Sequence, residues 1–488
     1  MIDKYKNLLI TLISDQAIPN ILFADYYQVK DNFILFVTTE KMIKDRKVEY
    51  ILKALQLISQ EGNFLEGQNY SIIKVNENSI KDLFIQVEDW LKDKNNIAIL
   101  NNLEKIIVNV TSGTKLMSIG LYNFFADIIE NINEKFNINI KNLEIIYLPV
   151  GENKILKLLE NGKFIENMFE IKRRIRVSES CSAYGLEIIN QDKLNKKADI
   201  AMKDKEISKF IIENYYGKFE HFLSFLYKEF FTKDSQTDKS IFDKYNSIKN
   251  NNNKHKNKNL IVEKKFIDFS MTYNINKHDK DNSLTDAEIL VKLIIDLFNF
   301  DKFKIKGSKY INIDAEYNEN DGHKNKLIIS GKLSLRDVEF LRGGWFEEFC
   351  FNEINDLKKD GLIDDVILNA EIKSFDTNAN NEFDILFTAQ NNFYIAECKS
   401  LSQENDKQTD ILYKISALRQ EFGLTITSFL VSLAKDNILD KSKKDSVCIK
   451  ESLQDRAKQL KCKIINPDDI TNLKTVLKNF LNTQANNI

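Results

Sequence analysis

The sequence is poor in the residues that build zinc sites, disulfide frameworks and membrane spans. Its 5 cysteines are scattered over 488 residues, and no two are spaced as Cys-x-x-Cys. This spacing argues against a zinc site and suits a reducing compartment. No window approaches 18 uninterrupted apolar residues, and the start, Met1 to Lys4, does not lead into the apolar segment of a signal peptide. We therefore expect a cytoplasmic protein with no membrane partner.

The chain also lacks a net charge and a histidine-based site. Its 70 basic and 72 acidic residues nearly cancel, so any site for a polyanion must be a local feature. None of the 4 histidines has a partner at the spacing of a metal site or of a nucleophile and its base. Because the sequence has neither a Walker A motif nor a GxGxxG motif, ATP and NAD are poor candidates for a ligand.

The composition, 43% hydrophobic and 29% charged over 488 residues, is typical of a globular protein with two or three domains. In the first part, apolar strand-like segments alternate with helical ones, which predicts a parallel, doubly wound, Rossmann-like α/β domain. The expected strands are residues 6–14, 33–38, 70–75, 105–110 and 143–148, with helices from about Ile21 and over residues 41–58 and 80–91.

Polar residues follow several of these strands, at the sheet edge where such domains bind ligands. Asn109 to Met117 places hydroxyls, a glycine, a lysine and the amides of a helix start at one point, which suits a phosphate. The Ser14-Asp15-Gln16 loop adds a second polar set, and Thr38 and Thr39 end the second strand. The alternative, that Ser112 to Thr114 only cap a helix, is equally compatible with the residues.

The middle of the chain carries no recognisable chemistry. Residues 194–233 have a helical pattern with an aromatic stripe, which is typical of a core or a dimer interface. Residues 246–259 are almost entirely Asn and Lys and predict a mobile loop. A further helix is expected over residues 286–298, with strand-like pieces at 303–311 and 326–329.

Two apolar strands near the C-terminus contain three charged residues. If Ala389 to Asn392 form the loop between them, Thr388 pairs with Phe393, and the register places Asp384 opposite Glu397 at a Cβ distance of about 5 Å. Lys399 follows two residues later, so its side chain lies on the same face as that of Glu397.

Two carboxylates this close are unfavourable in a protein interior unless a cation or a hydrogen-bond network compensates them, and a divalent metal is the usual solution. Oxygen ligands favour Mg²⁺ or Mn²⁺, and a lysine beside the metal could orient a water or screen a phosphate. The alternative is a structural salt bridge between Lys399 and either carboxylate.

These residues resemble the PD-(D/E)xK nuclease signature, with Asp384 as its aspartate and Glu397-Cys398-Lys399 as its ExK, although Phe383 replaces the proline. The helix that opens with Gly343-Gly344-Trp345 resembles the start of this domain in CARF nucleases. The resemblance implies Glu347 as a further acidic residue, with Glu348 as the alternative. A helix over residues 408–423, with Lys414 and Arg419 as candidate phosphate contacts, and a strand at residues 428–433 complete an αβββαβ order.

The Asn109 to Met117 segment resembles the NxTGGTKxM motif of CARF domains, the sensors of cyclic oligoadenylate in type III CRISPR defence, with Ser112 in place of the first glycine. Residues 13–20 and 177–185 are also similar to segments of CARF nucleases. No Arg-x-x-x-x-His pair of the HEPN ribonuclease type is present, which removes the commonest rival effector.

The resemblance implies a CARF domain over residues 1–165, a mixed, mostly helical insertion over 166–335, and a restriction-endonuclease-like domain over 336–488. It implies catalytic residues Glu347, Asp384, Glu397 and Lys399, and metal ligands Asp384, Glu397 and Cys398. It implies ligand contacts from Ser14, Asp15, Gln16, Thr38, Thr39, Asn109, Thr111, Ser112, Gly113, Thr114 and Lys115.

The function implied is a nuclease that uses Mn²⁺ or Mg²⁺, is activated by cyclic oligoadenylate, with four adenylates as the usual ring, and works as a homodimer. Single-stranded DNA, RNA and supercoiled duplex DNA are the implied substrates, with weak sequence specificity. Two alternatives stay open: a non-catalytic CARF regulator that binds nucleic acid, and a constitutive restriction-type endonuclease whose Rossmann-like half is structural.

Overall fold

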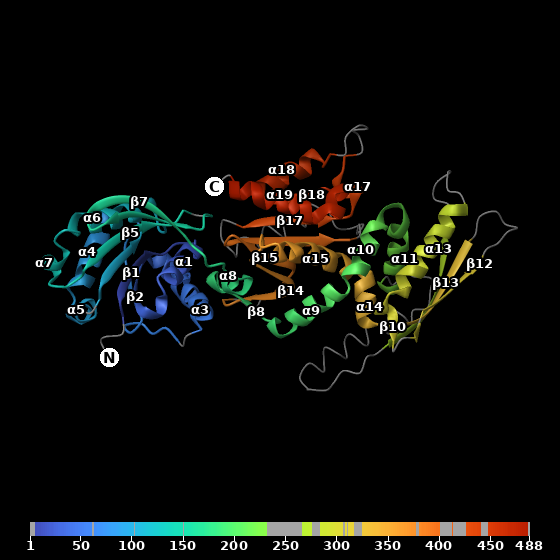
Figure 1. The fold of residues 1–488 in the computed structure, drawn as a ribbon, viewed down its shortest axis with the longest axis horizontal. Helices are drawn as coiled ribbons and strands as arrows, with labels where there is room; N and C mark the ends of the chain where they lie inside the picture. Colours follow the sequence, from blue (N-terminus) through green and yellow to red (C-terminus); the bar gives the residue numbers. More distant parts are fainter. Residues whose placement is uncertain are drawn as a thin grey trace.

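Three parts follow one another along the molecule in the computed structural model (Figure 1). The N-terminal α/β domain lies at one end, the C-terminal domain is in the centre, and the middle insertion forms the other end. The structure describes residues 5–60, 63–101, 103–149, 151–231, 266–275, 284–305, 308–309, 311–316, 325–376, 380–400, 412, 426–440 and 448–486. No helix within these ranges combines the length and the apolar character needed to cross a membrane.

The N-terminal domain is built on a sheet with the strand order β3-β2-β1-β4-β5-β6-β7. The strands are β1 (Asn7–Leu12), β2 (Asn32–Thr38), β3 (Tyr70–Lys74), β4 (Lys105–Asn109), β5 (Asn142–Tyr147), β6 (Lys154–Glu160) and β7 (Lys163–Glu170). From β3 to β5 all neighbours are parallel, as the sequence predicted, because helices cross over between them. The antiparallel β6–β7 hairpin at the edge was not predicted.

Helices cover both faces of this sheet. The helices are α1 (Ile18–Tyr26), α2 (Glu40–Lys44), α3 (Lys47–Ser59), α4 (Ile80–Lys92), α5 (Lys94–Leu100), α6 (Lys115–Ile128) and α7 (Ile132–Phe136). α1 and α3 bury their apolar residues on one face, and α4 and α6 on the other. The expected helix over residues 41–58 is broken at Arg46, which has a left-handed φ of 54°. α1 begins three residues earlier than expected, with Pro19 in its first turn.

The C-terminal domain is built on a sheet with the order β18-β17-β16-β15-β14-β8. Its strands are β14 (Asp365–Ser374), β15 (Asn380–Ala389), β16 (Asn392–Lys399), β17 (Thr427–Ser432) and β18 (Cys462–Ile465), with helices α15 (Trp345–Lys359), α18 (Glu451–Gln459) and α19 (Leu473–Asn486). α15 followed by β14, β15 and β16 gives the expected αβββ order. The helix expected over residues 408–423, with Lys414 and Arg419, lies outside the described residues apart from Leu412.

The segment that leaves the N-terminal domain completes this second sheet. It forms α8 (Val177–Ala183) and the short strand β8 (Leu186–Ile188), which pairs antiparallel with the end of β14. A single apolar cluster joins α1 and α3 to α8 and to the C-terminal sheet, where Leu386 and Ile395 take part. The two domains are therefore packed directly against each other.

The insertion combines helices with a small antiparallel sheet. Its elements are α9 (Gln191–Lys203), α10 (Lys205–Glu213), α11 (Glu220–Phe231), β9 (Phe266–Ile275), α13 (Leu284–Asn299), β10 (Lys304–Ile305), β11 (Ser308–Lys309), β12 (Ile311–Glu316) and β13 (Asn325–Ser334). The aromatic stripe is core, since Tyr215, Phe219 and Phe222 are buried in one cluster with Trp345 of α15. The sequence missed β9, and the expected loop at residues 246–259 lies outside the described ranges.

Candidate functional site

The hairpin β15–β16 has the register that the sequence predicted. Thr388 pairs with Phe393, and Ala389 also pairs with Asn392. The loop is therefore two residues, Gln390 and Asn391, rather than the four expected. Both have left-handed φ values, 51° and 61°, which is the requirement of the type I′ turn that suits the twist of a hairpin.

The regular pairing of the hairpin ends at the candidate carboxylates. The last pair is Ile385 with Ala396, so Asp384 and Glu397 come next in register. Where the pairing of the two strands ends, Asp384 Oδ2 accepts a hydrogen bond from the main-chain N–H of Cys398 at 2.7 Å. On the β14 side of β15, the regular pairing is interrupted: Asn369 and Asp384 are left out of the register, and Asn369 has a left-handed φ of 53°. Such local irregularities re-aim side chains at the edge of active sites.

Lys399 lies between the two carboxylates. Its Nζ is 2.9 Å from Glu397 Oε1 and 3.9 Å from Asp384 Oδ2. Burial raises the pKa of Asp384 well above its usual value, and the neighbouring Glu397 adds to the effect. Burial disfavours the charge of Lys399, but Asp384 and Glu397 outweigh it and raise its pKa. The ammonium therefore stays charged and neutralises part of the carboxylate pair.

Glu347 joins this group from the first turn of α15. Its Oε2 accepts a hydrogen bond from Asn369 Nδ2 at 2.9 Å. Burial raises its pKa, and it experiences the charges of Lys399 and Glu397. The helix start approaches the end of β16 closely, because a Cβ at Gly343 would lie 2.8 Å from Ser400 Oγ. The structure thus brings Glu347, Asp384, Glu397 and Lys399 to one place.

Glu348, the alternative to Glu347, lies in different surroundings. Burial raises the pKa of Glu348 to about 7, and besides Glu347 the charges that act on it are those of Lys302, Asp204 and Arg336. Asp204 already accepts hydrogen bonds from Lys302 at 2.6 Å and from Arg336 at 2.8 Å. Of the two glutamates, Glu347 is the one beside Asp384.

Cys398 does not present its thiol to the carboxylates. The side chain is buried in the core with Cys350 of α15, and the hydrogen bond to Cys350 is the main cause of its raised pKa. Successive strand residues point to opposite faces, so Glu397 and Lys399 share the other face. Only the main chain of Cys398 is available to this site.

The donor set fits a hard divalent cation. Three carboxylates face a single ammonium here, and oxygen donors favour Mg²⁺ or Mn²⁺. Among the described side chains, no three His, Cys, Asp or Glu residues are close enough together to hold an ion by themselves. Main-chain oxygen or water would therefore complete any coordination, as Mg²⁺ commonly requires.

In the N-terminal domain, a buried polar network supports the segment after β4. Asn109 donates to Thr11 Oγ1 at 3.1 Å and accepts from the N–H and hydroxyl of Thr111. Thr11 and Ser112 both donate to Asn20 Oδ1, at 2.9 and 3.2 Å. Asn109 and Ser112 are almost fully buried, so their side chains hold the loop in shape. Sequence reasoning missed Thr11 and Asn20, whose signal is a polar residue inside an apolar segment.

The remaining candidates of this loop are accessible. Thr114 caps α6 by accepting from Met117 N–H at 3.2 Å, and both Thr114 and Lys115 are exposed. Gly113 has a φ of 85°, which favours glycine. The opposite loop is also accessible at Ser14, Asp15 and Gln16.

Thr38 and Thr39 are less available than the other candidates. Both are buried. Thr39 caps α2 by accepting from Met42 N–H at 3.3 Å, whereas the Thr38 hydroxyl has no hydrogen-bond partner among the described residues. Both lie at the end of β2, on the sheet edge shared with Ser14 and Thr111.

Two domain families match the sequence. The Card1 CARF domain matches residues 8–180, and the Card1-like endonuclease domain matches residues 335–484. The chain belongs to the CARF-domain nucleases of type III CRISPR systems. This confirms the family, the α/β fold class and the enzymatic activity expected from the motifs. No curated protein matches the sequence of this nuclease.

Solved structures share the fold of the CARF nuclease over its whole length. Protein VC1899 from Vibrio cholerae aligns with a TM-score of 0.59 at 13% identity, covering 98% of each chain. Can2 from Sulfobacillus thermosulfidooxidans, solved in complex with cyclic tetra-adenylate, aligns with a TM-score of 0.56 at 14% identity, covering 96% of this chain and 98% of Can2. At such identities the similarity shows the common fold alone.

Proposed function

We propose that cyclic tetra-adenylate activates this CARF nuclease, and that the activated nuclease hydrolyses phosphodiester bonds with the help of Mn²⁺ or Mg²⁺. The observation that carries the proposal is the convergence of Glu347, Asp384 and Glu397 around Lys399. This arrangement combines carboxylates that can bind a metal ion with an ammonium group that can stabilise negative charge on a phosphate.

In this site, Asp384, Glu397 and the main chain of Cys398 would hold the metal. When bound, the ion would supply an activated water and neutralise charge on the phosphate. Lys399, held charged by its carboxylate neighbours, would orient the attacking water and screen the phosphate under attack. Glu347, fixed by Asn369 at 2.9 Å, would support the metal from the helix side.

The substrates proposed are single-stranded DNA and RNA, together with supercoiled duplex DNA that is nicked. The chain shows no motif for reading bases, so cleavage should depend little on sequence. The near-zero net charge means that substrate binding must rely on local cations rather than on the overall field of the protein.

The proposed activator site lies at the C-terminal edge of the parallel strands. Gly113, Thr114 and Lys115 offer amides and a cation at the start of α6, and Ser14, Asp15 and Gln16 face them from the loop after β1. The support comes from the CARF match and from the Can2 structure with cyclic tetra-adenylate. Thr111, Ser112 and Asn109 would act by fixing the loop.

We further propose that two copies share one activator molecule in the cytoplasm. A cyclic ligand with internal symmetry is gripped most evenly across a two-fold axis. Apolar side chains next to the loop support this, since Leu116 and Ile119 of α6 are 37% and 54% exposed. A second copy would cover them.

The decisive experiment combines the protein with cyclic tetra- or hexa-adenylate, Mn²⁺ or Mg²⁺, and labelled DNA and RNA. We expect cleavage only with both the activator and the metal, and a loss of cleavage on chelation. If the activator binds in calorimetry but no combination yields cleavage, the protein is a non-catalytic regulator. Full cleavage without any cyclic nucleotide, and no binding, would identify a constitutive endonuclease.

A further inference from the structure

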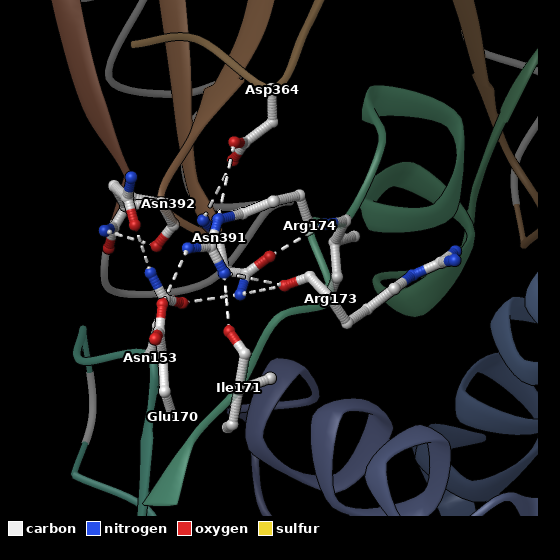
Figure 2. Close-up of polar contacts among 10 residues, drawn as sticks. Asn153, Glu170, Ile171, Arg173, Arg174, Asp364, Asn391 and Asn392 are labelled. Atoms are coloured by element: carbon white, nitrogen blue, oxygen red, sulfur yellow. Dashed lines mark hydrogen bonds and ion pairs between the residues drawn. The ribbon is translucent and has the colours of Figure 1, made fainter. Parts of the chain in front are cut away.

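The turn of the catalytic hairpin is anchored in the CARF domain mainly by the side chain of Asn391 (Figure 2). Asn391 Nδ2 donates to Asn153 Oδ1 at 2.6 Å and to the carbonyl of Arg173 at 3.0 Å. Its Oδ1 accepts from the N–H of Ile175 at 2.7 Å. The amide therefore uses both its donor and its acceptor on segments far from it in sequence, which fixes its orientation.

The partners of Asn391 belong to two parts of the CARF domain. Asn153 directly precedes β6, and it also donates to Gln390 Oε1 at 2.5 Å. Arg173 and Ile175 lie in the strap between β7 and α8. On the nuclease side, Asp364 accepts from Asn391 N–H at 3.2 Å, so the turn is tied to both domains.

The same region reaches the proposed activator loop. The N–H of Leu148 donates to Thr111 Oγ1 at 2.7 Å, and the chain then runs from Leu148 to Asn153 between β5 and β6. Gln16, in the loop that faces the activator, lines a small cavity together with Pro149, Gly151 and Asn391. Gln16 and the hairpin turn therefore border the same cavity, and Thr111 is hydrogen-bonded to Leu148, five residues before Asn153.

The strands of the hairpin connect the anchored turn to the carboxylates. Asn391 is six residues from Glu397 along β16, about 20 Å at the rise of an extended strand. From Ile385 to Ala389 on β15 and from Phe393 to Cys398 on β16 every residue is buried, so this part of the hairpin moves as a unit with its neighbours. A displacement at the turn must therefore reach Asp384 and Glu397, or break the bonds of Asn391.

We propose that Asn391 is a positioning residue that couples the activator loop to the catalytic carboxylates. The coupling rests on the proposed function, because it transmits the binding of the activator. Movement of Asn153 or of the strap pulls the turn through three hydrogen bonds and thereby sets the spacing of Asp384 and Glu397. Asn391 itself touches neither activator nor substrate.

The test uses Asn391→Gly in the full-length protein. Glycine adopts the left-handed φ of 61° readily, so the turn is kept and only the side-chain bonds are lost. The matched control is Asn137→Gly, because Asn137 is exposed and has a φ of 53° at the end of α7. Asn391→Asp keeps the acceptor for Ile175 and loses the donor, and should give an intermediate result.

The first measurement is hydrogen–deuterium exchange without activator. We expect Asn391→Gly to speed exchange both in the strap, residues 171–176, and in the hairpin near residues 384–399, whereas Asn137→Gly changes neither. Unchanged exchange in the hairpin would refute the coupling, whether or not cyclic tetra-adenylate proves to be the activator.

The second measurement is the ratio of the cleavage rate with activator to the rate without it. We expect Asn391→Gly to lower this ratio about tenfold, at unchanged affinity for cyclic tetra-adenylate within about a factor of two. A proportional loss of both rates would show a merely structural role and overturn the proposal. Absence of stimulation in the unmodified protein would instead refute the proposed function, and the exchange measurement would still decide the coupling.

Discussion

Lys399 Nζ lies 2.9 Å from Glu397 Oε1 and a full ångström farther, 3.9 Å, from Asp384 Oδ2. Glu397 is 2% exposed, so the carboxylate of this ion pair is shielded from water, whereas the Lys399 side chain is 30% exposed. A buried charge that loses its partner is destabilising. The position of Glu397 therefore makes it both the main partner of the lysine and a proposed metal ligand.

Replacing Glu397 by Gln should reduce cleavage by at least about a hundredfold while leaving activator affinity unchanged, because the metal and Lys399 both lose a charged partner. The wild-type protein should gain about 3 kcal/mol of stability at a metal concentration near a hundred times its Kd, and the variant should lose this gain. Thermal melting with and without Mn²⁺ measures this gain in stability.

The control for Glu397→Gln is Glu187→Gln, which changes an exposed glutamate of β8 in the same sheet. Normal cleavage by Glu397→Gln would show that the site is elsewhere.

Ser112→Gly, which restores the glycine of the CARF motif, should change activator affinity less than about threefold. Ser112 is buried and its hydroxyl donates to Asn20 at 3.2 Å, so the expected cost is about 1 kcal/mol of folding stability. Gly113→Ala should behave differently, because its Cβ would lie 3.2 Å from Leu12 Cβ at a φ of 85°. We expect a loss of about 1–2 kcal/mol and weaker binding. Calorimetry and melting curves together distinguish the two positions. A large change in affinity for Ser112→Gly would mean that the serine contacts the ligand.

Lys115→Ala should weaken binding of cyclic tetra-adenylate about tenfold, because this exposed lysine is the first residue of α6, where free helix amides and a cation together favour a phosphate. The difference from wild type should shrink as salt concentration rises. Lys141→Ala provides the control, since Lys141 precedes β5 at the opposite edge of the sheet and pairs with Glu104 at 3.3 Å. Equal affinities of both variants for the activator would exclude a contact by Lys115.

Glu348→Gln should make the protein more stable at neutral and alkaline pH. Burial raises the pKa of Glu348 to about 7 in the folded protein, above the ordinary value of 4.5. Between these two values the folded state binds more protons than the unfolded state, so stability falls as the pH rises from about 4.5 through 7. The loss of unfolding free energy amounts to about 3 kcal/mol above pH 7. The glutamine variant does not show this loss because its side chain has no titrating group.

Parallel unfolding curves of wild type and Glu348→Gln, measured from about pH 5 to pH 8, provide the test of this titration. Their difference in unfolding free energy should grow with pH. A constant difference would mean that Lys302 and Arg336 keep Glu348 ionised throughout. Glu353→Gln, five residues farther along α15, is a comparison in which the pKa is also raised by burial.

The centre of the nuclease site was accessible from sequence because strand periodicity and a short turn fix a register. Asp384, Glu397 and Lys399 were placed together by counting from Thr388 and Phe393, and that pairing is observed. The error in the turn length did not matter, since Ala389 and Asn392 extend the same register. Counting did not reveal that the β15–β16 ladder ends at Ile385, or that the pairing of β15 with a third strand, β14, is interrupted at Asp384 and Asn369.

Other elements were missed for physical reasons that differ. β9 shows a regular alternation of apolar and polar residues from Ile267 to Ile275, and the β6–β7 turn contains Asn161-Gly162, a strong hairpin signal. Both signals were present in the sequence. β8 is only three residues long and forms because β14 offers it an edge, which no local pattern can predict. The anchoring of Asn391 likewise depends on residues more than 200 positions away.

The strand β8 means that the chain cannot be divided cleanly between the two domains. Its residues follow the CARF domain in the chain but pair with Ser374, Lys373 and Ile372 of β14. A protein cut before the endonuclease match at residue 335 would leave the β14 side of the nuclease sheet open, and an open edge invites pairing with other chains. The segment between the two domains thus supplies a structural piece of the nuclease sheet, and the endonuclease domain alone is not a self-contained module.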